Sequence, residues 1–185
     1  MTPAETNSLV LGGGCFWCTD AAYRLLPGVR SVTCGYAGGR EPNPTYEQIC
    51  AHTTDHAEVV KIDFDPAQVS LEKLLAYFWK VHDPTQVGGQ GHDMGPQYRS
   101  IILHADAAQQ AAAQYSRAEA GQIFRDPITT EIGPLEKFWP AEDYHQDYFA
   151  KNPHQGYCAA VIAPKVRKLK QNLADLRSPT RQLRV

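Results

Sequence analysis

Three consecutive glycines at positions 12–14 separate a short apolar run from a segment with the character of a helix. The apolar residues 9–11 predict a strand, and residues 15–26 predict a helix that a Pro-Gly pair then ends. Because glycine permits tight backbone turns, the chain can pass directly from this strand into the helix. Cys15 is therefore expected where a strand turns into a helix.

The following segments predict the order of the remaining core elements. Residues 29–35 predict a second strand, and residues 36–45, dense in Gly, Pro and Asn, predict a loop. Residues 60–65 alternate apolar and charged side chains, which indicates a strand with one solvent-exposed face. Ser70 can cap an amphipathic helix, and residues 100–104 predict the next strand. This β-α-β-β-α-β order predicts an α+β fold, the ferredoxin-like split βαβ sandwich with a mostly antiparallel sheet and helices on one face.

The rest of the chain is expected to form C-terminal extensions of this core. Its patterns predict a helix over residues 106–121, a strand over 128–132, a helix over 141–152 and a last helix over 166–176. The last helix carries an apolar stripe surrounded by basic side chains, which we interpret as a solvated face. Since we find no repeat or linker, we expect one domain over residues 1–185 with a core of about 8–160.

Composition and charge exclude several classes of protein. The 185 residues are 43% hydrophobic with a formal net charge of -2, which suits one compact domain without a strong field for nucleic acid or a membrane surface. The N-terminal residues lack the features of a signal peptide, and no apolar run reaches the length of a bilayer span. We therefore predict a cytoplasmic monomer that binds neither nucleic acid nor a membrane.

Five cysteines, an odd number, favour thiol chemistry over a secreted disulfide framework. A structural zinc site needs four ligands, and beyond Cys15 and Cys18 the chain offers only the isolated Cys34, Cys50 and Cys158, so we expect no metal. Burial as small apolar side chains is a second interpretation of the pair. The third is a nucleophile, because unpaired N–H groups at a helix start favour the thiolate of Cys15. Cys18, one helical turn on, can then close a disulfide with it.

Phe16 and Trp17 lie between the two cysteines, and aromatic side chains of this kind are commonly core residues. Here both leave the chain beside the reactive thiol, where an aromatic wall suits a small apolar group such as an S-methyl. We therefore expect Phe16 and Trp17 to bind substrate. His145 lies on an amphipathic stretch, where a lone histidine is at least as often a structural hydrogen-bonding residue as a catalytic one, so we leave it out of the catalytic set.

Six blocks of sequence, in order along residues 9–158, resemble the peptide methionine sulfoxide reductase A family. They are GCFW at 14–17, GYAGG at 35–39, NPTY at 43–46, HAE at 56–58, GHD with GPQYRS within 91–100, and AEDYHQ at 141–146. The resemblance implies reduction of the S-epimer of methionine sulfoxide, free or in proteins, on a ferredoxin-like α+β fold. It also implies thioredoxin as the electron donor and no bound cofactor.

The resemblance also implies roles for individual residues. A thiolate can attack the sulfur of a sulfoxide only if the oxygen is protonated or strongly hydrogen-bonded as negative charge grows on it. Glu58 matches the family's acid, and partial burial at the start of a strand can raise its pKa. Tyr46 and Tyr98 match two tyrosines whose hydroxyls donate to the oxygen, and Asp93 matches a carboxylate that orders water or supports the donors. Taken alone, Glu58 would more often be a solvated carboxylate at a strand end, and the two tyrosines would more often be half-buried packing residues. Their joint match to the family favours the functional roles.

Attack leaves Cys15 as a sulfenic acid, which condenses with a nearby thiol to form a disulfide. Two resolving cysteines are available, because Cys18 is one turn away and Cys158 matches the tail position of a recycling cysteine in the family. Proximity favours Cys18, since the loop to be closed is very short. Cys158 then either passes the disulfide to thioredoxin or is simply packed. Cys34 and Cys50 are expected to be buried bystanders.

Two positions depart from the family pattern, and other functions compete. Asp20 replaces a glutamate, which puts its hydrogen bond in doubt, and Asp55 replaces a glycine, where aspartate would tolerate a left-handed backbone. An RNA-binding module shares the predicted element order, but residues 9–11 lack the stacking aromatics it needs. The main alternative is a general CxxC disulfide oxidoreductase or thiol peroxidase, which shares the reactive thiol but needs no acid beside it.

Overall fold

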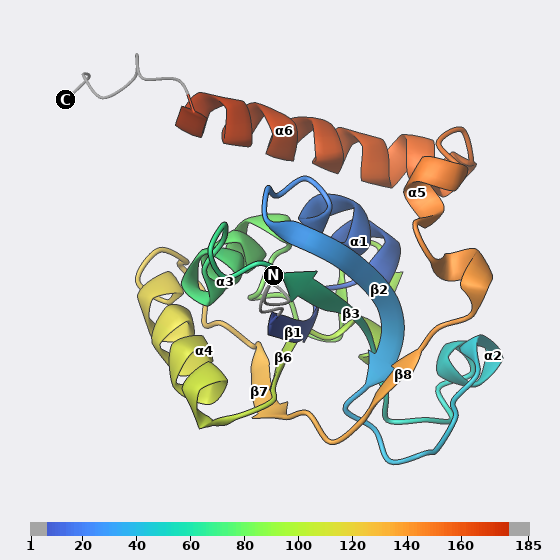
Figure 1. Cartoon of the computed structure of the whole chain (residues 1–185). Helices are drawn as coiled ribbons and strands as arrows, with labels where there is room; N and C mark the ends of the chain where they lie inside the picture. Colours follow the sequence, from blue (N-terminus) through green and yellow to red (C-terminus); the bar gives the residue numbers. More distant parts are fainter. Residues whose placement is uncertain (1–6, 178–185) are drawn as a thin grey trace, which may run out of the picture.

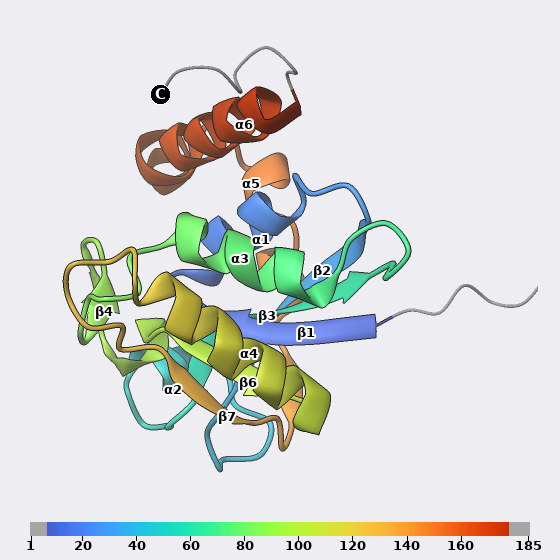
Figure 2. The same cartoon turned by 90° about the vertical axis from the view of Figure 1, so that its left-hand side faces the viewer.

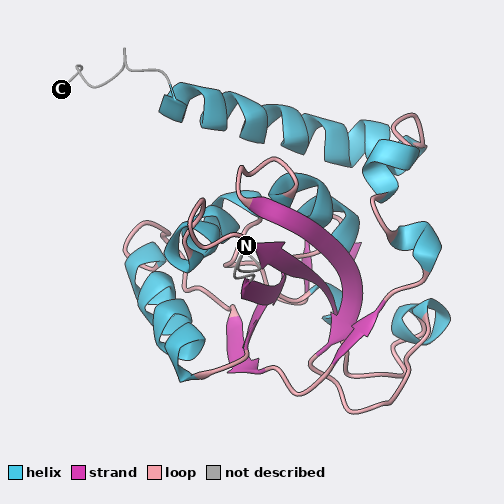
Figure 3. Cartoon of the chain, viewed as in Figure 1, coloured by secondary structure: helices cyan, strands magenta, loops and turns pink. Residues whose placement is uncertain are grey.

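The computed structural model describes residues 7–177, with side chains through residue 173, as an α+β fold around a curled sheet (Figure 1). The six strands of this sheet are β1 (Asn7–Gly12), β2 (Val29–Ala37), β3 (Ala57–Phe64), β6 (Ile101–His104), β7 (Glu131–Pro134) and β8 (Phe138–Pro140). Their order is β7-β6-β1-β3-β2-β8, and β6 with β7 is the one parallel pair within this sheet. The predicted α+β class is therefore confirmed, with a mixed sheet whose curvature Figure 3 shows in magenta.

Helices α1 (Phe16–Tyr23), α3 (Leu71–Val81) and α4 (Ala107–Ala120) pack against one face of the sheet. Figure 2 shows α6 (Ala163–Arg177) lying beyond α1 and α3, and residues of α6 contact both helices. The shorter elements are α2 (Tyr46–Cys50), β4 (Gly89–Gln90), β5 (Asp93–Met94), η1 (Pro96–Tyr98), η2 (Asp143–His145), α5 (Tyr148–Lys151) and the π-helical η3 (Cys158–Ile162). The C-terminal extensions thus cover the helix that begins after Cys15.

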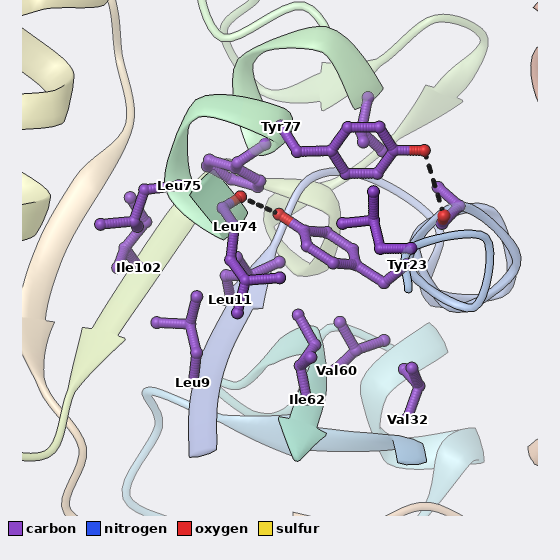
Figure 4. Packing of buried hydrophobic residues seen from close by; sticks show 14 of the residues in the cluster. Leu9, Leu11, Tyr23, Val32, Val60, Ile62, Leu74, Leu75, Tyr77 and Ile102 are labelled. Carbon is purple, nitrogen blue, oxygen red and sulfur yellow. Dashed lines mark hydrogen bonds between the residues drawn. The ribbon is translucent and has the colours of Figure 1, made fainter. Parts of the chain in front are cut away.

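The core lies between the sheet and its helices. Leu9 and Leu11 of β1 join the large cluster on the helical face, whereas Val10 joins a smaller cluster on the opposite face, because side chains alternate along a strand. Two buried tyrosines tie α1 to α3, as the dashed lines in Figure 4 mark. The Tyr23 hydroxyl donates to the carbonyl of Leu74 at 2.9 Å, and the hydroxyl of Tyr77 donates back to α1 at 3.1 Å. These bonds hold the C-terminal end of α1 against α3.

The expected helix over residues 141–152 is wrong. Only η2 and the single turn of α5 form there, and between them Gln146 and Asp147 interrupt the helix. The Gln146 side chain accepts from the backbone N–H of Cys34 at 2.8 Å and donates to its carbonyl at 3.0 Å. Asp147 has a φ of 52°, in the left-handed region that ends helices. These tertiary hydrogen bonds to β2 replace the local ones of a helix.

The other predicted elements are present with shifted boundaries. The strand expected at residues 128–132 lies at Glu131–Pro134, beside β6. The last helix begins earlier than predicted, because the π-helical turn η3 leads directly into α6 at Ala163. Lys165 consequently lies inside this helix and is half-buried.

Within residues 7–177, none of the helices combines the length and the apolar character that crossing a bilayer requires.

Candidate active site

Cys15 precedes the first residue of α1 and acts as its N-cap. Its carbonyl accepts from the backbone N–H of Cys18 at 3.1 Å, which begins the helix. Gly14 has a φ of +93°, and a Cβ added to it would lie 2.7 Å from the Cβ of Gln90, so the turn before Cys15 requires glycine. The glycine run thus sets the Cys15 side chain at the helix start, where it is 8% exposed.

A cavity of about 190 Å³ opens beside this thiol. It is lined by Cys15, Phe16, Trp17, Tyr46, Glu58, Asp93, Tyr98 and Tyr157. The structure therefore brings together all seven residues that the sequence predicted as catalytic or substrate-binding, from five separate parts of the chain. Two hollows of about 450 and 500 Å³ lie elsewhere, but no cysteine lines either of them. We assign the candidate site to the smaller cavity because it contains the reactive groups.

Glu58 lies at the start of β3 and is only 2% exposed. Its Oε2 accepts from the backbone N–H of Phe16 at 3.0 Å, so the carboxyl is joined to the first turn of α1. Burial raises the pKa of Glu58 from 4.5 to about 8, and the negative charges of Asp93 and Cys18 act in the same direction. The predicted rise in pKa is confirmed. At pH 7 the carboxyl is mostly protonated and has a proton to donate.

The two predicted tyrosines stand on short elements at the cavity. Tyr46 begins α2, where its backbone N–H donates to Oε1 of Glu142 at 2.8 Å. The other oxygen of Glu142 accepts from the Tyr36 hydroxyl at 2.8 Å, so this carboxylate joins α2 to β2. Burial raises the pKa of both Tyr46 and Tyr98 above its ordinary value. Both hydroxyls therefore stay protonated and can donate hydrogen bonds into the cavity.

Asp93 is held by a residue that the sequence did not single out. The hydroxyl of Tyr157 donates to Oδ2 of Asp93 at 2.5 Å and lies 3.8 Å from Sγ of Cys18. Tyr157 thus connects the loop carboxylate to the second cysteine. Its position immediately before Cys158 was the available signal, but no local pattern indicates that its ring reaches the cavity.

The Trp17 side chain is held in place by Tyr148 and His145. Its ring stacks on Tyr148 with 3.8 Å between centroids, and its Nε1–H donates to Nδ1 of His145 at 3.1 Å. His145 is fully buried, does not line the cavity, and has a pKa lowered by burial, so its ring is neutral and can accept this bond. This hydrogen bond agrees with a structural role for His145, and its exclusion from the catalytic set stays a prediction.

The thiols of Cys15 and Cys18 are hydrogen-bonded to each other. This bond, burial and the neighbouring Glu58 raise the pKa of Cys15 above its ordinary value. The bond to Cys15 and the charge of Lys165 lower the pKa of Cys18 to about 7. The contact with Cys18 and burial thus oppose the lowered pKa expected of Cys15 at the helix start, and the Cys15 thiolate stays a prediction.

All five cysteines are free thiols in the structure. Cys158 is fully buried and shares a cluster with Cys15 and Cys18, and burial together with the charge of Cys18 raises its pKa. Cys34 is buried as expected, with its Sγ 3.8 Å from the carbonyl oxygen of Phe16. The expectation of burial is wrong for Cys50, which is exposed because the short helix α2 turns Ile49 toward the core instead.

The two departures from the family pattern lie outside the cavity. Asp20 is buried, and its Oδ1 accepts from Nε of Arg24 at 3.0 Å, whereas Oδ2 has no hydrogen-bond partner among the described residues. Burial raises the pKa of Asp20 to about 6. Asp55 does not adopt a left-handed backbone conformation, and its carbonyl accepts from Arg99 at 2.9 Å.

Comparisons with known proteins identify the family of this chain. The family model described as peptide methionine sulfoxide reductase matches residues 7–177. A protein of Nautilia profundicola named peptide methionine sulfoxide reductase MsrA is 57% identical over 159 residues, which are 86% of this chain and 91% of that protein.

Two solved structures of a yeast protein extend the comparison. The crystal structure of Mxr1 from Saccharomyces cerevisiae in reduced form has a TM-score of 0.80 at 34% identity, covering 84% of this chain and 91% of that one. Mxr1 in complex with Trx2 has a TM-score of 0.58 at 26% identity, covering 79% and 86% of the two chains. With a family model that spans nearly the whole sequence and a relative at 57% identity, this chain belongs to the peptide methionine sulfoxide reductase family.

Proposed function

We propose that this protein reduces the S-epimer of methionine sulfoxide, free or in proteins, to methionine, with thioredoxin as the electron donor. The observation that carries this proposal is a thiol, a buried carboxyl with a pKa of about 8 and two tyrosine hydroxyls around one cavity of about 190 Å³. A protonated acid beside a thiol is the pairing that a sulfoxide needs, because its oxygen leaves the sulfur only with a proton supplied. Phe16 and Trp17 supply an apolar wall for the S-methyl group.

In the first step the sulfur of Cys15 attacks the sulfur of the sulfoxide. Glu58 gives its proton to the oxygen, and Tyr46 and Tyr98 donate hydrogen bonds to it. The proton that Cys15 loses replaces the one that Glu58 gives up, so the step consumes no net proton. The oxygen passes to Cys15, which becomes a sulfenic acid, and the substrate leaves as methionine. Asp93 acts through Tyr157, because its carboxylate accepts a hydrogen bond from the Tyr157 hydroxyl.

In the second step Cys18 attacks the sulfenic sulfur of Cys15, which forms a disulfide and releases water. The hydrogen bond between the two thiols supports Cys18 as the resolving residue. Cys158 is buried in the same cluster and interacts with Cys18. Its closeness to Cys18 supports a later thiol–disulfide exchange that passes the disulfide to Cys158. Thioredoxin then reduces this disulfide, and a related chain, yeast Mxr1, has been crystallised in complex with Trx2.

We also assign a ferredoxin-like core within one domain. The order β6-β1-β3-β2, with antiparallel neighbours throughout, supports this assignment because it is the strand order of a split βαβ sandwich. One domain over residues 1–185, with its core at about 8–160, stays a prediction, as do a cytoplasmic location and a monomeric state.

The experiment is a single turnover of the fully reduced protein with a racemic methyl sulfoxide and no electron donor. We expect consumption of the S-epimer alone. Peptide mapping by mass spectrometry should then identify a Cys15–Cys18 disulfide. Cys15→Ser should abolish the reaction, while Cys18→Ser should still release one methionine per chain but fail to recycle with thioredoxin. Normal recycling by Cys18→Ser would move the resolving role to Cys158.

A general CxxC disulfide oxidoreductase or thiol peroxidase is the competing function. It would use Cys15 and Cys18 without a protonated carboxyl and two tyrosines around the cavity. If neither epimer were consumed while peroxide or insulin disulfides were reduced, this alternative would replace the proposal.

A further inference from the structure

Lys165 of α6 lies next to Cys18 of α1, although the two residues are 147 positions apart in the sequence. Its Nζ is 3.9 Å from Sγ of Cys18, and the side chain is half-buried where α6 packs on α1. The sequence indicated only a solvated basic face for this helix. The structure instead directs one of its cations toward a thiol behind the cavity.

Lys165 has no acidic partner that would neutralise its charge within the described residues. No carboxylate there lies within 4.0 Å of its Nζ. The titratable or charged groups that interact with Cys18 are Cys15, Glu58, Asp93, Tyr157, Cys158 and Lys165. Lys165 is the one cation of that set, so it is the group that can balance a negative charge on Cys18.

We propose that Lys165 is a positioning residue that holds Cys18 as a thiolate for its attack on the Cys15 sulfenic acid during recycling. This proposal rests on the proposed function. The attack forms the Cys15–Cys18 sulfur–sulfur bond and breaks the sulfur–oxygen bond of Cys15. The leaving hydroxide takes one proton from solvent and departs as water, so that the Cys18 sulfur is oxidised and the sulfenic sulfur of Cys15 is reduced to the disulfide level. Lys165 does not line the cavity, so the first attack on the sulfoxide does not need it.

The electrostatics of Cys18 agree with this role. The hydrogen bond from Cys15 and the charge of Lys165 hold the pKa of Cys18 at about 7, against burial and the charge of Asp93. A thiol whose pKa is close to the ambient pH is the best attacking group, because it combines a large thiolate fraction with high nucleophilicity. Without the cation, the thiolate fraction at pH 7 falls toward the few per cent of an ordinary cysteine.

The test compares Lys165→Met and Lys165→Arg with the control Lys168→Met, an exposed lysine one turn along α6. Reduced protein is mixed with methionine sulfoxide without an electron donor, and methionine and the Cys15–Cys18 disulfide are quantified over time. Dimedone traps the sulfenic acid, and urea unfolding checks that each variant is folded. We expect an unchanged methionine burst in all variants.

Disulfide formation by Lys165→Met should be slower by about three- to tenfold at pH 7, with accumulation of trapped sulfenic acid. Its pH profile should move to higher pH, because loss of a cation raises the pKa of the thiol that it faces. Lys165→Arg should restore most of the rate, and Lys168→Met should match the unmodified protein.

A normal burst with an unchanged rate and pH profile in Lys165→Met would overturn the role of Lys165 while leaving the proposed function intact. A disulfide that forms directly between Cys15 and Cys158 would overturn it as well. Absence of any methionine burst from the unmodified protein would instead refute the proposed function itself. If disulfide formation is slow in Lys165→Met and equally slow in Lys165→Arg, the effect comes from packing, and this result would also refute the role of the charge.

Discussion

Replacing Glu58 with glutamine is expected to make the protein slower and more stable at the same time. The unfolded chain ionises this carboxyl near its ordinary pKa of 4.5, whereas the folded protein keeps the proton up to about 8. A group with a raised pKa therefore destabilises the fold progressively as the pH rises through this interval. Each pH unit costs about 1.4 kcal/mol, so the carboxyl lowers the free energy of unfolding by about 3 kcal/mol at pH 7. Glutamine has no charge to desolvate, and its carbonyl can still accept from the N–H of Phe16.

The assay is urea unfolding of the reduced Glu58→Gln and unmodified proteins at pH 5 and pH 8. We expect the stability advantage of Glu58→Gln to grow by about 3 to 4 kcal/mol between these two pH values. Glu119→Gln, an exposed carboxylate of α4, is the control and should change stability by less than about 0.5 kcal/mol at both. The single-turnover rate of Glu58→Gln should fall by about 10² to 10⁴, because the proton donor is lost.

Two results would refute this reasoning. A stability difference that does not change with pH would mean that Glu58 ionises at the same pH in the folded and unfolded chains. A single-turnover rate equal to that of the unmodified protein would mean that the sulfoxide oxygen receives its proton from another group.

Two further predictions concern the walls of the site and its support. Trp17→Phe loses the hydrogen bond to His145 and part of the stack on Tyr148, so we expect kcat/KM for methyl sulfoxides to fall roughly tenfold, mainly through KM; a loss confined to kcat in steady-state kinetics would contradict a binding role. Tyr23→Phe removes the buried hydrogen bond from α1 to the carbonyl of Leu74, and urea unfolding should report a loss of about 0.5 to 1.5 kcal/mol, compared with nearly none for the exposed Tyr115→Phe.

The element order of the core was predictable because its signals are local. Residues 9–11, the glycine run and the helix that follows appear as β1, a turn with a positive φ at Gly14, and α1. Ser70 caps α3 as predicted, with its side chain accepting from the N–H of Lys73 at 3.3 Å. Such patterns depend on neighbours within one or two turns, which any sequence displays directly.

The C-terminal third was less predictable because long-range contacts decide its conformation. An amphipathic pattern over residues 141–152 favours a helix locally, yet hydrogen bonds from Gln146 to β2 prevent it. Exposure of Cys50 has the same origin, since only the packing of α2 decides which side of a five-residue helix faces the core. Propensity differences of a fraction of a kcal/mol per residue are too small to outweigh such contacts.

The sequence by itself determined the chemistry of the candidate site, because the residue types and their order along the chain identify the thiol, the acid, the tyrosines and the family to which the chain belongs. The tertiary structure decided how these groups act on one another. Burial of Glu58 raises its pKa to about 8, while the approach of α6 to α1 places Lys165 beside Cys18. Desolvation and Coulomb interactions depend on distance through space and on access to water, and a linear sequence specifies neither for residues 147 positions apart.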